Sequence, residues 1–185
     1  MAAPTLSPLQ QASLVVLRTL VGWHLIYEGY FKLLYPAWSR AGSPMERFTS
    51  LGYLRGVEGP FAPLFHALAN PAWMPWIDGA VAAALLLAGA SLMLGLFTQA
   101  GCVIAAGLLA IFYLSAIPVR GMPEPHAEGT YLLVNKNLIE AAAVVVVFAF
   151  RTGWIAGLDC LRRASRIGDR RWAMGNGLGK SPLSH

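Results

Sequence analysis

The stretch GAVAAALLLAGASLMLGLFTQAGCVIAAGLLAIFYLSAIPV, residues 79–119, contains no Asp, Glu, Lys, Arg or His. A membrane-spanning helix needs about 20 predominantly apolar residues, and this stretch is about twice as long. Near its middle, Thr98 and Gln99 interrupt the run of apolar side chains. We therefore expect two spans here, at about residues 76–97 and 100–118, joined by a tight turn.

Two more apolar segments flank this pair, at about residues 9–35 and 131–150. The first carries charged residues within its length, and the second begins with polar residues and ends in the uncharged run AAAVVVVFAF. The chain has 56% hydrophobic and only 12% charged residues, whereas soluble domains carry about 25% charged residues. We therefore predict an all-α fold, an integral membrane four-helix bundle that occupies residues 1–155.

The segment between the first two spans, residues 36–75, is rich in proline and tryptophan. A connection of about 40 residues is far longer than most loops, so secondary structure within it is expected. Residues 43–54 and 60–69 are each predicted to form a short helix that lies on the outer end of the bundle. Such an outer, partly helical loop either covers a binding site or covers only the helix ends.

The net charge of +5 comes from the C-terminal part of the chain. The Lys/Arg and Asp/Glu residues of 1–150 balance each other, so residues 151–185 hold the basic excess. Such an excess is typical of a cytoplasmic flank close to anionic lipid, so no nucleic acid partner is expected. Residues 156–185 are predicted to be a cytoplasmic tail, disordered from Gly175 onward. Four spans then place both termini in the cytoplasm of a bacterial-type inner membrane.

Polar and charged side chains interrupt the first and fourth spans. Ionisable groups inside a span cost several kcal/mol, so they usually face a partner or a cavity. Glu28 precedes Lys32 by four residues, which is the favourable order for an ion pair along a helix. In the predicted topology, Glu28 and Lys32 lie near the outer face of the membrane, at the same depth as the polar residues that begin the fourth span. The candidate site residues are Arg18, Glu28, Lys32, Asn135, Lys136, Asn137 and Glu140.

Within this set, Arg18 is expected about two helical turns deeper than Glu28, as a separate anchor. Gly22 and Gly29 lie on the same face of the first helix as Arg18. Small residues let membrane helices approach closely, so this face is predicted to point into the bundle.

Two interpretations of the remaining polar residues stay open. They form either a structural network that fixes helix register or a site for the polar head of a quinone. In both cases Lys32 and Glu140 are expected to pair across the first and fourth helices. In the second case, Tyr27 or Tyr30 would add a further hydrogen-bonding group beside the quinone carbonyls.

Residues typical of redox cofactor sites are sparse. His24 is the sole histidine within a predicted span, whereas a bis-histidine haem needs two. Cys102 and Cys160 form neither a CxxC pair nor a metal-ligand spacing. His126 is a lone histidine in a predicted loop, and such a residue is most simply solvated. The glycine-rich fingerprints of dinucleotide and phosphate sites are also missing. No haem, flavin or metal site is evident, so a redox role needs an electron carrier on another protein.

Four stretches of the sequence stand out together: RTLVGWHLIYEGYFK (residues 18–32), GPFAPLFHALANP (59–71), LGLFTQAG (94–101) and YLLVNKNLIEA (131–141). In this order they resemble the DoxX/DoxD family of small membrane proteins. The resemblance implies a four-helix bundle. Its namesake is a subunit of thiosulfate:quinone oxidoreductase, which passes electrons from thiosulfate to membrane quinone. The resemblance therefore also implies quinone as a ligand and a separate protein as a partner.

The resulting prediction is the membrane subunit of a redox complex, which interacts with quinone and takes electrons from a separate partner protein. The chain would then be part of a quinone-dependent oxidoreductase. The alternative is a non-catalytic membrane anchor or assembly factor for a soluble enzyme. A small transporter is disfavoured because the chain has few spans and no internal repeat.

Overall fold

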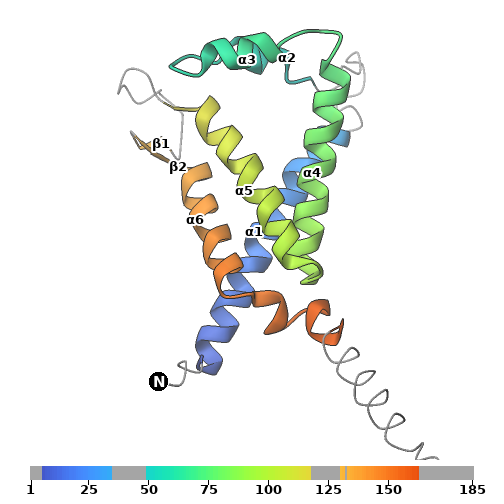
Figure 1. The fold of residues 1–185 in the computed structure, drawn as a ribbon, viewed down its shortest axis with the longest axis vertical. Coiled ribbons are helices and arrows are strands. Elements are labelled where there is room, and N and C mark those ends of the chain that lie inside the picture. Colours follow the sequence, from blue (N-terminus) through green and yellow to red (C-terminus); the bar gives the residue numbers. More distant parts are fainter. Residues whose placement is uncertain (1–5, 35–48, 118–129, 132, 163–185) are drawn as a thin grey trace, which may run out of the picture.

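A computed structural model of the chain describes residues 6–34, 49–117, 130–131 and 133–162. The structure is mostly helical, as predicted (Figure 1). The helical elements are α1 (Pro8–Leu34), α2 (Leu51–Arg55), α3 (Ala62–Leu68), α4 (Met74–Leu94), α5 (Thr98–Ser115), α6 (Lys136–Ala149) and the 3-10 turn η2 (Thr152–Trp154). Two short strands, β1 (Thr130–Tyr131) and β2 (Val134–Asn135), pair antiparallel before α6. This hairpin departs from the predicted all-α fold.

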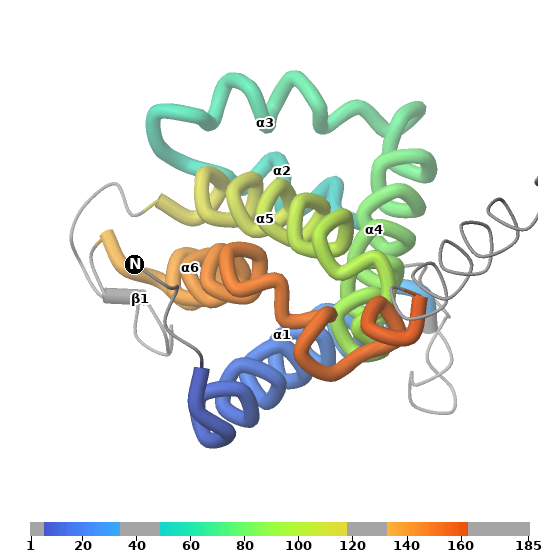
Figure 2. Tube along the Cα trace, turned by 60° about the horizontal axis from the view of Figure 1, so that its bottom comes forward, coloured from blue at the N-terminus to red at the C-terminus, as the bar shows by residue number. Residues whose placement is uncertain are grey.

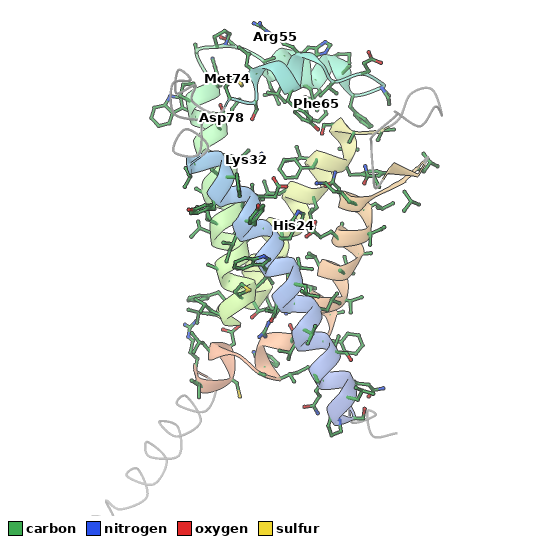
Figure 3. All side chains as sticks on the ribbon, turned by 180° about the vertical axis from the view of Figure 1, so that it is seen from behind. His24, Lys32, Arg55, Phe65, Met74 and Asp78 are labelled. Atoms are coloured by element: carbon green, nitrogen blue, oxygen red, sulfur yellow. The ribbon has the colours of Figure 1, made fainter. Side chains whose placement is uncertain are left out.

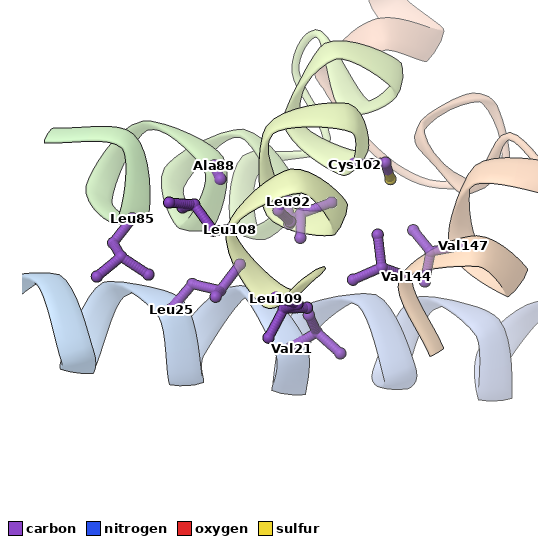
Figure 4. Close-up of a cluster of buried hydrophobic side chains, with 11 residues drawn as sticks. Val21, Leu25, Leu85, Ala88, Leu92, Cys102, Leu108, Leu109, Val144 and Val147 are labelled. Carbon is purple, nitrogen blue, oxygen red and sulfur yellow. The ribbon is translucent and has the colours of Figure 1, made fainter. Parts of the chain in front are cut away.

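The long helices α1, α4, α5 and α6 pack side by side (Figures 1 and 2). Helix α1 lies between α4 and α6, and α5 packs on the same two helices from the other side. Apolar side chains from all of these helices meet at the centre (Figure 4). The core residues are Val21, Leu25, Leu85, Ala88, Leu92, Cys102, Ala105, Leu108, Leu109, Val144 and Val147.

Glycines bring α1 and α4 into close contact. A Cβ atom added to Gly22 would lie 2.9 Å from the backbone nitrogen of Met93, and one added to Gly89 would lie 2.7 Å from the carbonyl oxygen of Gly22. A Cβ atom on Gly29 would lie 2.9 Å from the Cγ atom of Leu86. The prediction that Gly22 and Gly29 point into the bundle is therefore confirmed.

Helices α4 and α5 are each long and apolar enough to cross a membrane. They match the predicted spans at 76–97 and 100–118 to within a few residues. The turn between them starts at Gly95, whose φ of 62° lies in the left-handed region that favours glycine. Composition alone was therefore enough to place this helical hairpin.

The last long helix starts later than predicted. The span at 131–150 was expected to be helical from its beginning, but α6 starts at Lys136. The reason is local, since the β1–β2 hairpin uses the preceding backbone and Asn135 is the N-cap. The side-chain oxygen of Asn135 accepts a hydrogen bond from the Leu138 backbone N–H at 3.0 Å.

Helices α2 and α3 lie across one end of the bundle (Figure 1) and together form the cap. Phe65 and Met74 belong to a second buried apolar cluster, which joins the cap to α4. The Tyr53 hydroxyl lies 2.6 Å from the Ser115 Oγ atom, which ties α2 to the end of α5. The predicted short helices thus exist, within residues 51–55 and 62–68.

Some predicted features fall outside the described residues. They are the first part of the expected helix at 43–54, the loop with His126, and the tail beyond Arg162 with its predicted disordered end.

Candidate functional site

A hydrogen bond between ionisable side chains joins α1 to α6 inside the bundle. The Nδ1 atom of His24 lies 2.6 Å from the Oε1 atom of Glu140. The Glu140 side chain is only 12% exposed, whereas that of His24 is 38% exposed. Buried carboxylates are costly unless they are paired, so this contact fixes the relative rotation of the two helices.

His24 begins a line of ionisable groups on α1. The Nε2 atom of His24 lies 3.7 Å from Glu28 Oε1, and Glu28 Oε2 lies 4.0 Å from the Nζ atom of Lys32. The spacing of four residues places these side chains one above another on a single helix face. We call His24, Glu28 and Lys32 the α1 row. It runs from the middle of the bundle toward the cap (Figure 3).

Helix α6 adds a further charge near the α1 row. Lys136 is exposed in the first turn of α6 and interacts electrostatically with Glu28. The row therefore faces Glu140 at its inner end and Lys136 nearer the cap. Acidic and basic groups alternate along it, so that each charge has an opposite charge as neighbour.

Aromatic side chains flank the row on α1. Trp23, Tyr27 and Tyr30 are 58%, 51% and 39% exposed, so their faces point away from the protein core. The rings of Tyr27 and Phe31 pack with their centroids 4.5 Å apart. The row thus lies beside an accessible aromatic surface that carries hydroxyl groups, a combination suited to a flat ligand with polar atoms at its edge.

The α1 row and Glu140 provide a proton donor and acceptor set. With a proton on Nδ1, the imidazole donates to the Glu140 carboxylate, and its Nε2 atom faces a second carboxylate, that of Glu28. Histidine can gain or lose a proton near neutral pH, and adjacent carboxylates stabilise the charged imidazolium. Among the described residues, no group of three or more His, Cys, Asp or Glu is arranged to hold a metal ion. The contacts of His24 with Glu140 and Glu28 bring together groups that can exchange protons.

The structure distributes the predicted site residues over three places. Glu28 and Glu140 contact His24, Lys32 contacts Glu28, and Lys136 lies at the edge of this group. Asn135 is buried and caps α6, and Asn137 is half-buried in the first turn of the same helix. Arg18 lies apart from all of these residues.

Arg18 acts at the end of the bundle opposite the cap. Its Nη1 atom donates to the carbonyl oxygen of Thr152 at 2.9 Å, and its Nη2 atom donates to that of Ala156 at 2.6 Å. Arg18 is buried at 3% exposure, so these carbonyls replace water at its Nη1 and Nη2 atoms. The prediction of a separate anchor is confirmed, although sequence reasoning had grouped Arg18 with the candidate ligand-binding residues.

Asp159 strengthens the same end. Its carboxylate accepts hydrogen bonds from the backbone N–H groups of Phe97 and Thr98, at 2.8 and 2.9 Å, and from the Thr98 hydroxyl at 2.9 Å. Burial alone raises the pKa of Asp159, but these hydrogen bonds outweigh it and leave the pKa below its ordinary value. Asp159 therefore fixes the start of α5 to the segment after η2.

Two features of the site differ from the sequence predictions. Lys32 was expected to pair with Glu140, but Lys32 forms its ion pair with Glu28, and the contact between helices is made by His24. His24 had been considered only as a haem ligand. The available signal was the spacing of His24, Glu28 and Lys32 at four-residue intervals, which places all three on one helix face.

Comparison of the chain with known protein families, with curated proteins and with solved structures found no match.

Proposed function

We propose that this protein is the membrane subunit of a quinone-dependent redox complex, and that the polar head of a quinone binds beside His24 and Glu140. The observation that carries the proposal is the 2.6 Å contact between these side chains, which joins α1 and α6 within an apolar bundle. A quinone carbonyl needs a proton donor at hydrogen-bond distance, and the imidazole supplies one. The exposed ring of Tyr27 offers a surface on which a quinone ring can stack.

A membrane location supports this proposal. In the apolar windows of α4 and α5, only 28% and 39% of the residues are buried inside the protein, whereas the core helix of a soluble protein is mostly buried. Large apolar side chains are exposed on α1 and α6 as well as on α4 and α5. Examples are Leu20, Trp23, Leu87, Val103, Ile111, Ile139, Val145 and Phe148. Soluble monomers rarely expose so much contiguous apolar surface, so we propose that all the long helices contact lipid.

The proposed orientation places the cap outside and the η2 end in the cytoplasm. Arg151 and Arg162 lie at the η2 end over the rings of Trp154 and Phe97, at 4.6 and 4.1 Å. Basic and aromatic side chains together are typical of a cytoplasmic membrane interface. Reporter fusions test this: a fusion after Leu183 should be active only in the cytoplasm, and an insertion at Gly52 only outside. The opposite pattern would reverse the orientation.

In this proposal the electrons come from a separate protein. A soluble redox partner at the η2 end would supply them. The alternative function is a membrane anchor for a soluble enzyme. The exposed side chains of Leu158 and Leu161 at the η2 end favour it as a second candidate, since they offer a docking surface.

Binding of quinone probes to the purified protein in lipid nanodiscs tests the proposal. A short-chain ubiquinone and menadione are titrated and followed by quenching of tryptophan fluorescence. Loss of one charge-assisted hydrogen bond is worth about 1.5–3 kcal/mol, so His24→Gln should weaken binding by about tenfold or more. His66→Gln is the matched control, since His66 lies in the cap and contacts the Val57 carbonyl oxygen.

The outcomes separate the two candidate functions. Quinone binding that His24→Gln weakens and His66→Gln does not supports the redox subunit. If neither probe binds, and a soluble protein co-purifies tightly with the chain, the anchor function is correct instead. Equal weakening by both variants would place the quinone away from His24.

A further inference from the structure

We propose that the α1 row is a proton path between water at the cap end and the His24–Glu140 pair. This inference rests on the proposed function for its purpose, because quinone reduction consumes protons at the site. The path itself consists of this chain's own residues and can be measured without any ligand.

Geometry supports a path rather than an isolated ion pair. His24 and Lys32 are separated by two steps of four residues, which corresponds to about 12 Å along the helix axis. Glu28 lies between them, and its carboxylate is 3.7 Å from the imidazole and 4.0 Å from the ammonium group. Both gaps exceed direct hydrogen-bond length, and one bridging water molecule or a small side-chain rotation closes each.

The surroundings direct protons along this row. From Gly79 to Ser115, the sequence of α4 and α5 contains no Asp, Glu, His, Lys or Arg. From α6, Glu140 and Lys136 interact with the row. The acidic residue of α4, Asp78, lies at the cap end, where its carboxylate accepts a hydrogen bond from the Ser50 backbone N–H at 3.0 Å. In a bilayer, the open side of His24 faces acyl chains, which cannot carry a proton. Glu28 is then the nearest group through which the imidazole reaches water at the cap end.

The proton balance follows from the chemistry of the ligand class. Reduction of a quinone to a quinol takes up two electrons, here from the reduced soluble partner, and two protons, one on each oxygen. His24 gives up a proton at the site and regains one from Glu28. For this transfer, the Glu28 carboxylate first takes up a proton from water at the cap end. After it has passed the proton to the imidazole it is a carboxylate again, and the ammonium group of Lys32 offsets its charge. The row thus restores the same protonation state after each transfer.

Nuclear magnetic resonance on the ligand-free protein tests the path. The chain is labelled with ¹⁵N-histidine in lipid nanodiscs, and the His24 signal is assigned by its loss in His24→Gln. The measured quantity is the rate of proton exchange between the imidazole N–H and water. Glu28→Gln cannot relay a proton as a carboxylate does, so exchange should slow by about tenfold or more. Glu28→Asp keeps the carboxylate and should give an intermediate rate.

Glu58→Gln is the matched control, because Glu58 is an exposed carboxylate near the cap but outside the row. Slow exchange in Glu28→Gln alone supports the path. An unchanged rate in Glu28→Gln, or an equal slowing in Glu58→Gln, overturns it. A path that passes this test while neither quinone probe binds would keep the proton path and reject quinone as its ligand. The two experiments therefore test the proton path and the quinone site independently of each other.

Discussion

Replacing Gly89 by alanine tests the close backbone contact between α1 and α4. An added Cβ atom would lie 2.7 Å from both the Gly22 carbonyl oxygen and the Ile26 backbone nitrogen. Ordinary contacts begin near 3.4 Å, so α1 must move away by about 0.7 Å, and the obstructing atoms are backbone that cannot rotate aside. Overpacking of this kind costs about 1–3 kcal/mol.

Gly107 in α5 offers a matched control. Nothing lies within 4 Å of a Cβ atom added there. Alanine is favoured over glycine in a helix by about 1 kcal/mol, and this gain is common to both positions. It cancels in the difference, so Gly89→Ala should be less stable than Gly107→Ala by about 1–3 kcal/mol.

The assay is unfolding of the purified protein by titration with sodium dodecyl sulfate in mixed micelles, followed by circular dichroism. Gly22→Ala should behave like Gly89→Ala, and the double variant should lose less than the sum, because both glycines serve one crossing. Equal stability of Gly89→Ala and Gly107→Ala would refute the reasoning, since it would mean that α1 and α4 do not meet at these residues.

Three further predictions concern polar contacts. Replacing His24 and Glu140 by glutamine, singly and together, should give non-additive losses of stability in the same assay. The reason is that either single change leaves one partner of a partly buried pair unmatched. Additive losses would show that the two side chains are not coupled. The hydrogen bonds to Asp159 lower its pKa, so they stabilise the fold above its ordinary pKa of 3.8 and are lost as pH falls through the lowered value. Asp159→Asn should therefore be less stable than wild type at pH 7, and the difference should shrink in acid; a constant difference would contradict the assignment. Asn135→Ala should destabilise the start of α6 by about 1 kcal/mol, seen as faster amide hydrogen exchange at Leu138, and unchanged exchange would remove Asn135 as the N-cap.

The sequence was sufficient for features that depend on local composition or spacing. The uncharged stretch placed α4 and α5, and the four-residue step from Glu28 to Lys32 predicted their ion pair. Gly22 was predicted to face inward because charged residues share its side of α1. Gly89 gave no such signal, since α4 is apolar all around and its sequence does not distinguish one face from another.

Contacts between distant helices were harder to predict. The pairing of His24 with Glu140 depends on the rotation and depth of α6, and its start at Lys136 differed from the predicted start at residue 131. The partners of Arg18 are backbone carbonyls, which every residue possesses and no motif reveals. Sequence reasoning therefore named most residues of this polar group but not the contact that joins α1 to α6.

The position of Arg18 has a consequence for how the chain is made. Its carbonyl partners lie 134 and 138 residues further along the chain. During synthesis, α1 leaves the ribosome long before Thr152 and Ala156, so the guanidinium group of Arg18 lacks both partners until almost the whole bundle has been made. The contacts of Arg18 can therefore form only late in the assembly of the fold. A chain that stops before Thr152 would leave the Arg18 guanidinium group without these carbonyl partners.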